Sequence, residues 1–344
     1  MQMGMISMAS ADRLRAMCVE GPRASSASIE PVRQAPICPL CGYCETSHAF
    51  SDNGCSLTTC SICGLFFVHP YPDRISQHAR VSAGASAQIE ILDCERRYMG
   101  ERLYYERHLG KIIEECQGAK SLLDVGCGTG YLLGALSSLP DFYTAGIELN
   151  AQAAQFARRV SGRPIYEVPL EEFRNDRKFD VITLINVLSH VPSFDGMFHS
   201  VRSLLRPGGK VILRTSEMRR NASRWNQVHW GIPDDIHFLG LETLDFLCAK
   251  YGFAVTRHDR APFEDELFLR SRWEQLGRSK LHNLVKAAGI HTPLALPILK
   301  KLYAAILGQR LFVSFIVLTP LDSRGSQANR EDHKSNPSVL KERH

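Results

Sequence analysis

The sequence predicts a doubly wound α/β domain with a small cysteine-rich module in front of it. A glycine-rich turn joins two apolar runs over 121–133. From there, strand-like and helical segments alternate towards residue 320, as in folds with a parallel sheet. Two C-x2-C pairs lie near the N-terminus. At 344 residues the chain is long enough for one full α/β domain with smaller attachments.

The glycine-rich turn indicates a ligand site. The apolar run 121–125 ends in Gly126, Gly128 and Gly130, with Cys127 between the first two, and a helical segment follows. This pattern is typical of a buried strand that turns sharply into a helix, with glycines where the backbone approaches a ligand. Phosphate groups are the usual ligands of such helix N-termini.

Three neighbouring residues favour a cofactor without phosphate. Tyr131 stands where a dinucleotide-binding turn has its third glycine. Asp124 lies just ahead of the turn, where a carboxylate repels a pyrophosphate and attracts a cation. Glu148, at the end of the next expected strand, is suited to binding both hydroxyls of a ribose. A ligand with a ribose, a positive amino-acid end and no phosphate fits best, and S-adenosylmethionine is such a ligand.

Four motifs in order resemble those of class I S-adenosylmethionine-dependent methyltransferases. They are the turn 124–130, Glu148, the segment 179–191 and the "L-x-P-G-G" segment 204–213. The resemblance implies a Rossmann-like, mostly parallel seven-stranded sheet whose last strand is antiparallel. It also implies that Glu148 binds the ribose and that Leu170 lines the adenine. The implied cofactor-binding residues are Asp124, Gly126, Cys127, Gly128, Gly130, Glu148, Leu170 and Asn186.

The resemblance also gives roles to the two ends of the bound cofactor and to two histidines. Asp124 and the glycine turn are expected to hold its methionine end, and Asn186 is expected beside the methyl group. His190 lies where the family often has Glu-His-Val, and His237 lies in a D-x-H segment like that of sugar-modifying methyltransferases. Both histidines are candidate general bases, and a packed structural histidine is an equally good interpretation of each. A base is needed only if the acceptor must lose a proton.

The elements of the main domain are expected in the following order. Strands are expected near 121–125, 143–148, 164–168, 180–186, 210–215, 253–259 and 311–319. Helices are expected at 150–160, with Asn150 as N-cap, at 194–205, ended by a Pro-Gly-Gly turn, and at 241–251, ended by Gly252. A helical region over about 89–116 is expected to cover the cofactor site, with Tyr98, Tyr104 and Tyr105 as candidate wall residues.

The cysteine pairs predict a structural zinc site. Eighteen residues separate the pairs, which is the spacing of two zinc knuckles. Four thiolates close a tetrahedron around the metal and leave no open position for catalysis. Cys44 and Cys55 lie between the pairs as spare thiols or alternative ligands. The segment resembles the zinc-binding module found ahead of many bacterial methyltransferase domains. The expected ligands are Cys38, Cys41, Cys60 and Cys63.

The remaining segments complete the expected organisation. The domain boundaries are a disordered leader over 1–35, the zinc-ribbon-like module over 36–72, a linker and helical cap over 73–118, the methyltransferase domain over 119–320 with a helical insertion at 261–310, and a disordered tail over 321–344. The basic insertion is interpreted first as a solvated lid or homodimer surface. A basic helix at a membrane surface is the alternative.

Composition limits the function further. The chain is 44% hydrophobic and 22% charged, with a net charge of +5, which is typical of a soluble globular protein. No apolar run reaches the roughly 18–20 residues that span a membrane, and no signal peptide pattern opens the sequence. Eleven cysteines in a chain of this size, some of them on metal, favour the reducing cytoplasm.

Three functions from different classes remain. The first is methyl transfer to a small-molecule acceptor, such as a sugar, a glycan precursor or a secondary metabolite. The second is RNA methylation with the zinc module binding RNA, but that module has no basic stripe, which argues against nucleic acid. The third is a non-catalytic cofactor-binding protein, against which the intact cofactor motifs argue.

Overall fold

The computed structural model describes residues 35–52, 54–83, 94–218, 232–240, 242–262 and 311–321. The predicted leader, the predicted basic insertion and the predicted tail lie outside these ranges, apart from their first or last one or two residues.

The centre of the described chain is a seven-stranded sheet with the order β10-β11-β8-β7-β4-β5-β6. Strand β11 runs antiparallel to both of its neighbours, whereas the pairs among β4 to β8 are parallel. The doubly wound, mostly parallel seven-stranded sheet is therefore confirmed, including its antiparallel last strand. The strands are β4 (Ser121–Val125), β5 (Tyr143–Ile147), β6 (Ile165–Tyr166), β7 (Phe179–Ile185), β8 (Leu205–Met218), β10 (Phe253–Pro262) and β11 (Leu311–Pro320).

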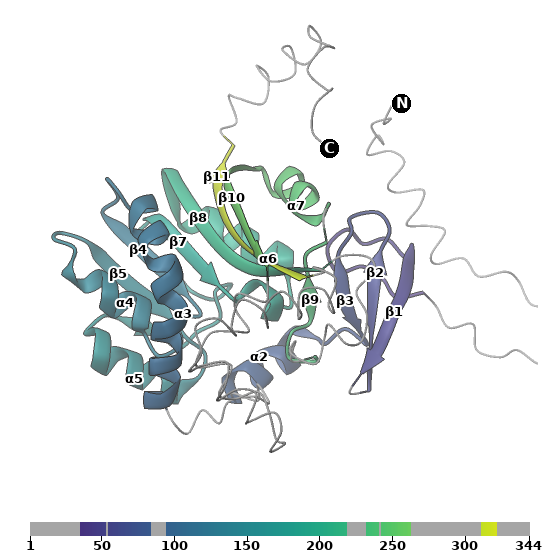
Figure 1. Cartoon of the computed structure of the whole chain (residues 1–344), viewed down its shortest axis with the longest axis horizontal. Helices are drawn as coiled ribbons and strands as arrows, with labels where there is room; N and C mark the ends of the chain where they lie inside the picture. Colours follow the sequence, from purple (N-terminus) through teal and green to yellow (C-terminus); the bar gives the residue numbers. More distant parts are fainter. Residues whose placement is uncertain are drawn as a thin grey trace, which may run out of the picture.

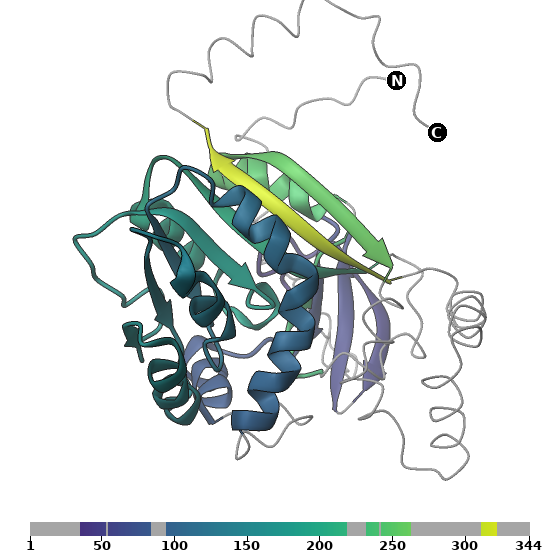
Figure 2. The ribbon, with the colours of Figure 1, turned by 60° about the vertical axis from the view of Figure 1, so that its left-hand side comes forward.

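Helices cover both faces of this sheet (Figures 1 and 2). Because side chains alternate along a strand, Leu122 packs in one core with α3, α4 and α5, while Leu123 packs in the other with α6 and α7. The helices are α3 (Cys94–Glu115), α4 (Tyr131–Ala135), α5 (Ala151–Ser161), α6 (Phe194–Leu204) and α7 (Thr243–Tyr251), with short 3-10 turns η1 (Leu136–Ser138) and η2 (Leu188–His190).

Local sequence signals determine where these helices begin and end. The Asn150 side chain accepts the Ala153 amide at 2.9 Å and so caps α5, as predicted. Gly252 ends α7 in the left-handed conformation with φ 69°. The end of α6 differs from the prediction, because β8 starts directly at Leu205. The Pro-Gly-Gly turn is absorbed as an irregularity early in β8, where its register with β7 shifts.

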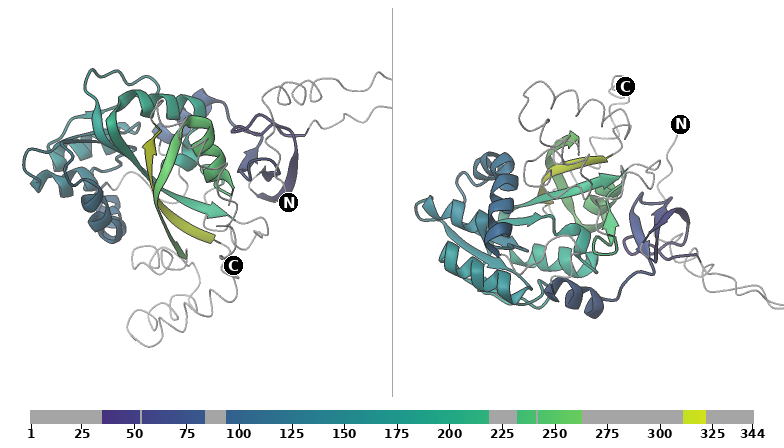
Figure 3. Two further views of the ribbon diagram at one scale, coloured as in Figure 1. Left: turned by 90° about the horizontal axis from the view of Figure 1, so that it is seen from above. Right: turned by 60° about the horizontal axis from the view of Figure 1, so that its bottom comes forward.

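The cysteine-rich module forms a second, four-stranded antiparallel sheet with the order β1-β2-β3-β9. Its first three strands are β1 (Thr46–Asp52), β2 (Cys55–Cys60) and β3 (Phe66–His69). The fourth, β9 (His237–Phe238), comes from the far part of the chain, and Figure 1 shows it beside β3. In both views of Figure 3 the module lies to one side of the α/β domain.

A helix, α2 (Arg74–Ala83), connects the module to the rest of the chain. The residues interpreted as the start of a linker thus form a helix. They carry no apolar period, and the described residue that α2 buries is the polar Gln77. The Gln77 side chain donates to the Asp234 carbonyl at 3.2 Å, so a hydrogen bond anchors this helix in place of an apolar stripe.

The cap of α6 gives a test of the fold. The Ser193 hydroxyl accepts the Gly196 amide at 3.0 Å. We expect Ser193→Ala to lower the free energy of unfolding by about 1 kcal/mol, because one amide loses its partner. Urea denaturation measures this change. Ser200→Ala, within the same helix, is the control and should change it by less than about 0.5 kcal/mol. Equal effects of the two substitutions would show that the cap does not stabilise α6.

Candidate functional site

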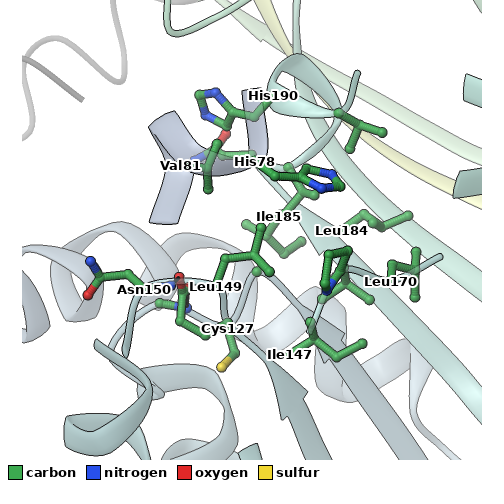
Figure 4. Close-up of a pocket in the computed structure, with 18 of the residues that line it drawn as sticks. His78, Val81, Cys127, Ile147, Leu149, Asn150, Leu170, Leu184, Ile185 and His190 are labelled. Atoms are coloured by element: carbon green, nitrogen blue, oxygen red, sulfur yellow. Dashed lines mark hydrogen bonds between the residues drawn. The ribbon is translucent and has the colours of Figure 1, made fainter. Parts of the chain in front are cut away.

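A cavity of about 400 Å³ opens at the carboxyl ends of β4, β5 and β7. The chain leaves β4 towards β5 on one side and returns to β7 on the other, so the strand order reverses here. Ligands of doubly wound sheets bind at this position. Figure 4 shows residues of the lining, with Cys127 and Asn150 on one side and His78 and His190 on the other.

The glycine turn forms part of the cavity wall. Gly126 and Gly128 line it with φ of 68° and 55°, a backbone region in which side chains are strained. A Cβ on Gly128 would meet the carboxylate of Glu101, so the close approach of the backbone requires glycine. Gly130 has a different role from the predicted one. It does not line the cavity, and a Cβ there would lie 2.9 Å from Ala157, so it allows α5 to pack closely.

Glu148 is held at the cavity by backbone amides. Its two carboxylate oxygens accept the amides of Gly128 and Asn150, each at 2.9 Å. Burial raises the pKa of this carboxyl, and the two amide hydrogen bonds oppose the shift. The side chain lines the cavity, as expected for a group that binds ribose hydroxyls.

Asp124 does not reach the cavity, which corrects its expected role. Its carboxyl is fully buried beneath the turn and accepts the hydroxyl of Thr183 at 2.6 Å. Burial raises the pKa of Asp124 to about 7, and the nearby charges of Glu101 and Glu148 add to the shift. Its second carboxylate oxygen is buried without a hydrogen-bond partner in the described part of the chain.

Helix α3 supplies two charged residues that the sequence analysis missed. Glu101 accepts both the amide and the hydroxyl of Thr129, directly beside the glycine turn. Arg97 donates to Glu101 at 3.0 Å, and both side chains line the cavity. Their i, i+4 spacing on a helix expected to cover the site was the available signal.

The candidate wall tyrosines have different positions. Tyr105 is buried and lines the cavity. Tyr98 packs edge-on against Tyr131, with ring centroids 5.5 Å apart, and is not part of the lining. The side chain of Tyr104 lies outside the described residues.

Leu170 and Asn186 both line the cavity, as do the other predicted positions Gly126, Cys127, Gly128 and Glu148. Asn186 has a φ of 58°, which is uncommon outside glycine and concentrates at functional sites. Its amide donates to the Arg214 carbonyl at 2.9 Å, and its side-chain oxygen accepts from the Arg214 guanidinium. These two contacts hold Asn186 in its unusual backbone conformation.

His190 is the predicted histidine that lines the cavity. Its Nδ1 donates to the Asp234 carbonyl at 3.0 Å, since a carbonyl only accepts. Its Nε2 lies 3.5 Å from the Asp235 carboxylate. A second histidine, His78 of α2, also lines the cavity and was missed because α2 was taken for a linker.

His237 does not support its predicted role as a base at the cavity. Its side chain is about 1% exposed and is absent from the cavity lining. The Nε2 donates to the Val191 carbonyl at 2.9 Å, and the ring packs on Phe194 with centroids 4.4 Å apart. Burial lowers the pKa of His237 to about 4, so the ring is neutral at pH 7. It is a packed structural histidine.

The four predicted zinc ligands come together in the module. The sulfurs of Cys38, Cys41, Cys60 and Cys63 all lie within 4.8 Å of one another, and neither Cys44 nor Cys55 belongs to this cluster. The closest sulfur pairs are 3.5 and 3.6 Å apart. A tetrahedral zinc with bonds of ~2.3 Å separates its sulfurs by about 3.8 Å, so the four thiols fit this metal.

Comparisons with known proteins agree with this site. Residues 96–258 match the family model described as a methyltransferase domain. The ubiquinone biosynthesis O-methyltransferase of Klebsiella pneumoniae subsp. pneumoniae is 29% identical over 157 residues, which are 43% of this chain and 64% of that protein. The protein of that name from Idiomarina loihiensis is 35% identical over 113 residues, 31% of this chain and 45% of its own length. The chain thus spans less than two thirds of these curated relatives.

Solved structures resemble the chain more weakly in sequence. An S-adenosylmethionine-dependent methyltransferase from Thiobacillus denitrificans, solved with S-adenosyl-L-homocysteine, is 17% identical with a TM-score of 0.43. That match covers 62% of this chain and 90% of the other. No helix in the described part of the chain is long and apolar enough to cross a membrane.

The family match includes the glycine turn, Glu148 and the cavity lining from β4 to β7. This part of the site therefore lies in the segment that matches a methyltransferase domain, in agreement with the resemblance of the four motifs.

The buried Asp124 carboxyl predicts a pH dependence of stability. Its pKa is about 7 in the folded protein and ~3.9 when unfolded. Between these values the folded state keeps a proton that the unfolded state releases, so rising pH lowers the free energy of unfolding. The loss is on the order of 4 kcal/mol once the pH passes 7. Asp124→Asn removes this loss.

Urea unfolding of Asp124→Asn and of the wild type, from pH 4.5 to 7.5, measures the effect. We expect the free energy of unfolding of the variant to increase relative to that of the wild type as pH rises. Asp176→Asn, at an exposed position, should show no such trend. A difference for Asp124→Asn that stays constant with pH would contradict the shifted pKa.

Proposed function

We propose that this chain is an S-adenosylmethionine-dependent methyltransferase that acts on a small-molecule acceptor such as a sugar, a glycan precursor or a secondary metabolite. The observation that carries the proposal is the cavity at the strand reversal. There a glycine turn and a buried carboxylate, Glu148, meet side by side within a methyltransferase domain. When bound, the cofactor supplies a methyl carbon made electrophilic by a sulfonium.

The residues of one half of the cavity suit this donor. We assign the ribose hydroxyls to Glu148 and the adenine to the apolar surface at Leu170. The methionine end carries one positive and one negative group, and the Arg97–Glu101 pair beside Gly128 offers a partner for each. This assignment replaces the expected contact with Asp124.

The other half of the cavity suits the acceptor. Methyl transfer is an in-line displacement, so much of its catalysis comes from holding the acceptor in place. Asn186 and His78 are polar residues that line this half. Because the Nδ1 of His190 carries the proton donated to Asp234, its Nε2 has the lone pair that a general base needs. The Asp235 carboxylate lies 3.5 Å from this nitrogen.

Two considerations narrow the range of possible acceptor molecules. The curated relatives are named as O-methyltransferases, which favours a hydroxyl oxygen as the methylated atom. Over 36–72 the zinc module contains neither Lys nor Arg, so it lacks the positive charge with which an RNA-binding module neutralises phosphates. We therefore propose that the chain methylates a hydroxyl oxygen of a small molecule. We also propose that it acts in the cytoplasm and that zinc has a structural role. Incubation with labelled donor and fractionated small-molecule extract, followed by identification of the labelled product, tests it.

The glycine turn provides a test of donor binding. We expect Gly128→Ala to lower the affinity for S-adenosylhomocysteine at least tenfold, because a Cβ there meets Glu101 and intrudes on the turn. Calorimetry measures the affinity. Gly162→Ala is the matched control, since Gly162 also has positive φ but has nothing within 4 Å of its Cβ position. Unchanged affinity in Gly128→Ala would place the donor elsewhere.

The two histidines provide a test of catalysis. We expect His190→Asn to lower kcat by about 10²-fold, the usual contribution of a positioned base. His237→Asn should instead lower the free energy of unfolding by ~2 kcal/mol, because it removes a buried hydrogen bond and ring packing. Steady-state kinetics and urea unfolding of both variants separate these effects. If His237→Asn lowers kcat more than His190→Asn, the base assignment is wrong.

A further inference from the structure

One short segment, 234–238, lies between the cysteine module and the cavity. On its module side, β9 pairs with β3, with Phe67 opposite His237 and Phe66 opposite Phe238. The amide of Val68 extends this pairing by donating to the Ile236 carbonyl at 2.9 Å. The segment is thus the edge strand of the module's sheet.

The other side of the same segment holds the acceptor half of the cavity. The amide of Ile236 donates to the Ser189 carbonyl at 2.8 Å. The carbonyl of Asp234 accepts Nδ1 of His190 at 3.0 Å. The position and tautomer of His190 therefore depend on backbone groups of a strand that the module fixes from behind. We call His190, Asp234 and Asp235 the acceptor wall.

The cysteine knuckles contact this strand closely. Gly64, directly after Cys63, lies against Gly240, and a Cβ on Gly240 would overlap the Gly64 carbonyl. The Cys60 amide donates to the Leu65 carbonyl at 2.8 Å, which holds the start of β3 to the second knuckle. Lys250 of α7 donates to the Leu40 carbonyl of the first knuckle at 2.8 Å. A change in the knuckles is transmitted directly to β3 and to the end of β9.

The donor half of the cavity is held differently. In the described chain, the hydrogen bonds that fix Glu148 come from Gly128 and Asn150, and those on Glu101 come from Thr129 and Arg97. All of these residues belong to α3 or to the turns after β4 and β5, and none belongs to the module over 35–69. The module thus bonds to the acceptor half and not to these donor residues, while α2 contacts both halves: the Asn150 side chain donates to the Ser82 carbonyl at 2.8 Å, and Gln77 donates to the Asp234 carbonyl at 3.2 Å.

We propose that the cysteine module is a positioning device for the acceptor wall: metal in the four-cysteine site holds β3 and β9, which hold His190. Release of the metal then loosens the acceptor wall and leaves the donor site intact. The inference rests on the proposed function, because that function identifies one half of the cavity as the donor site and the other half as the acceptor site. The coupling itself concerns only contacts within the chain. Metal binding fixes knuckles of this kind because their folding depends on it.

The test uses the full-length chain in three forms: as purified, stripped of metal by a chelator, and as Gly240→Ala. The Gly240→Ala variant keeps all four cysteines but forces the second knuckle away from the strand. Gly110→Ala is the control, because Gly110 lies on α3 with nothing within 4 Å of its Cβ position. Each form is examined for zinc content, amide hydrogen exchange at Val68 and Ile236, the protonated ring nitrogen of His190 by nitrogen NMR, and affinity for S-adenosylhomocysteine.

We expect one zinc per chain in the purified protein, in Gly240→Ala and in the control. In the stripped chain and in Gly240→Ala, exchange at both amides should accelerate at least tenfold, and the single Nδ1–H tautomer of His190 should be lost. Affinity for S-adenosylhomocysteine should stay within twofold of the wild type. If the stripped chain unfolds completely, the measurements on Gly240→Ala alone test the inference.

Three results would overturn the inference. They are a purified chain without bound metal, unchanged exchange and tautomer in Gly240→Ala, or a loss of affinity for S-adenosylhomocysteine that matches the loss of protection at Ile236. A wild-type chain that does not bind S-adenosylhomocysteine at all contradicts the proposed function instead. The exchange and tautomer measurements would then still test the coupling.

Discussion

The cavity depends on the two backbone hydrogen bonds that the Glu148 carboxylate accepts from Gly128 and Asn150. They join the turn after β4 to the end of β5 and the start of α5. A buried carboxylate is stable only when such donors replace water, and the amide of Gly128 can reach it because the turn carries no side chain there. The positions of Gly128 and Glu148, which are twenty residues apart in the sequence, thus constrain each other. The parallel sheet satisfies this constraint by ending both strands at the same edge.

The charges around this constraint favour a cationic ligand over an anionic one. Asp124, Glu101 and Glu148 lie close enough that the charges of the latter two raise the pKa of Asp124. Arg97 pairs with Glu101. A positive group added at the cavity would relieve the repulsion among the carboxylates, whereas a phosphate would add to it. The expectation that Asp124 attracts a cation stays a prediction, because burial raises the pKa of Asp124 to about 7 and so favours its neutral form.

The parts predicted from the sequence are those that local patterns determine. Strands β4, β5 and β7 are short, mostly apolar runs, and Asn150 and Gly252 mark helix ends by their own conformational preferences. What the sequence did not predict depends on contacts between distant residues. Strand β9 has two residues, and its partner β3 lies about 170 positions away. Helix α2 is anchored through Gln77 and has no apolar stripe. The choice between His190 and His237 was likewise open, since no pattern shows which imidazole is buried.

The same distant pairing makes the module and the methyltransferase domain one structural unit. Without β9, strand β3 would present unpaired backbone groups at the edge of a small sheet, which is unfavourable in water and prone to wrong pairing. Taking its last strand from the main domain removes that edge. The strand that covers it is also the one whose amide and carbonyl groups hold η2 and His190. The residues that complete the module therefore also build the site. A separation of the chain into an independent cysteine module and an independent α/β domain would leave the backbone groups of β3 and of 234–238 without these partners.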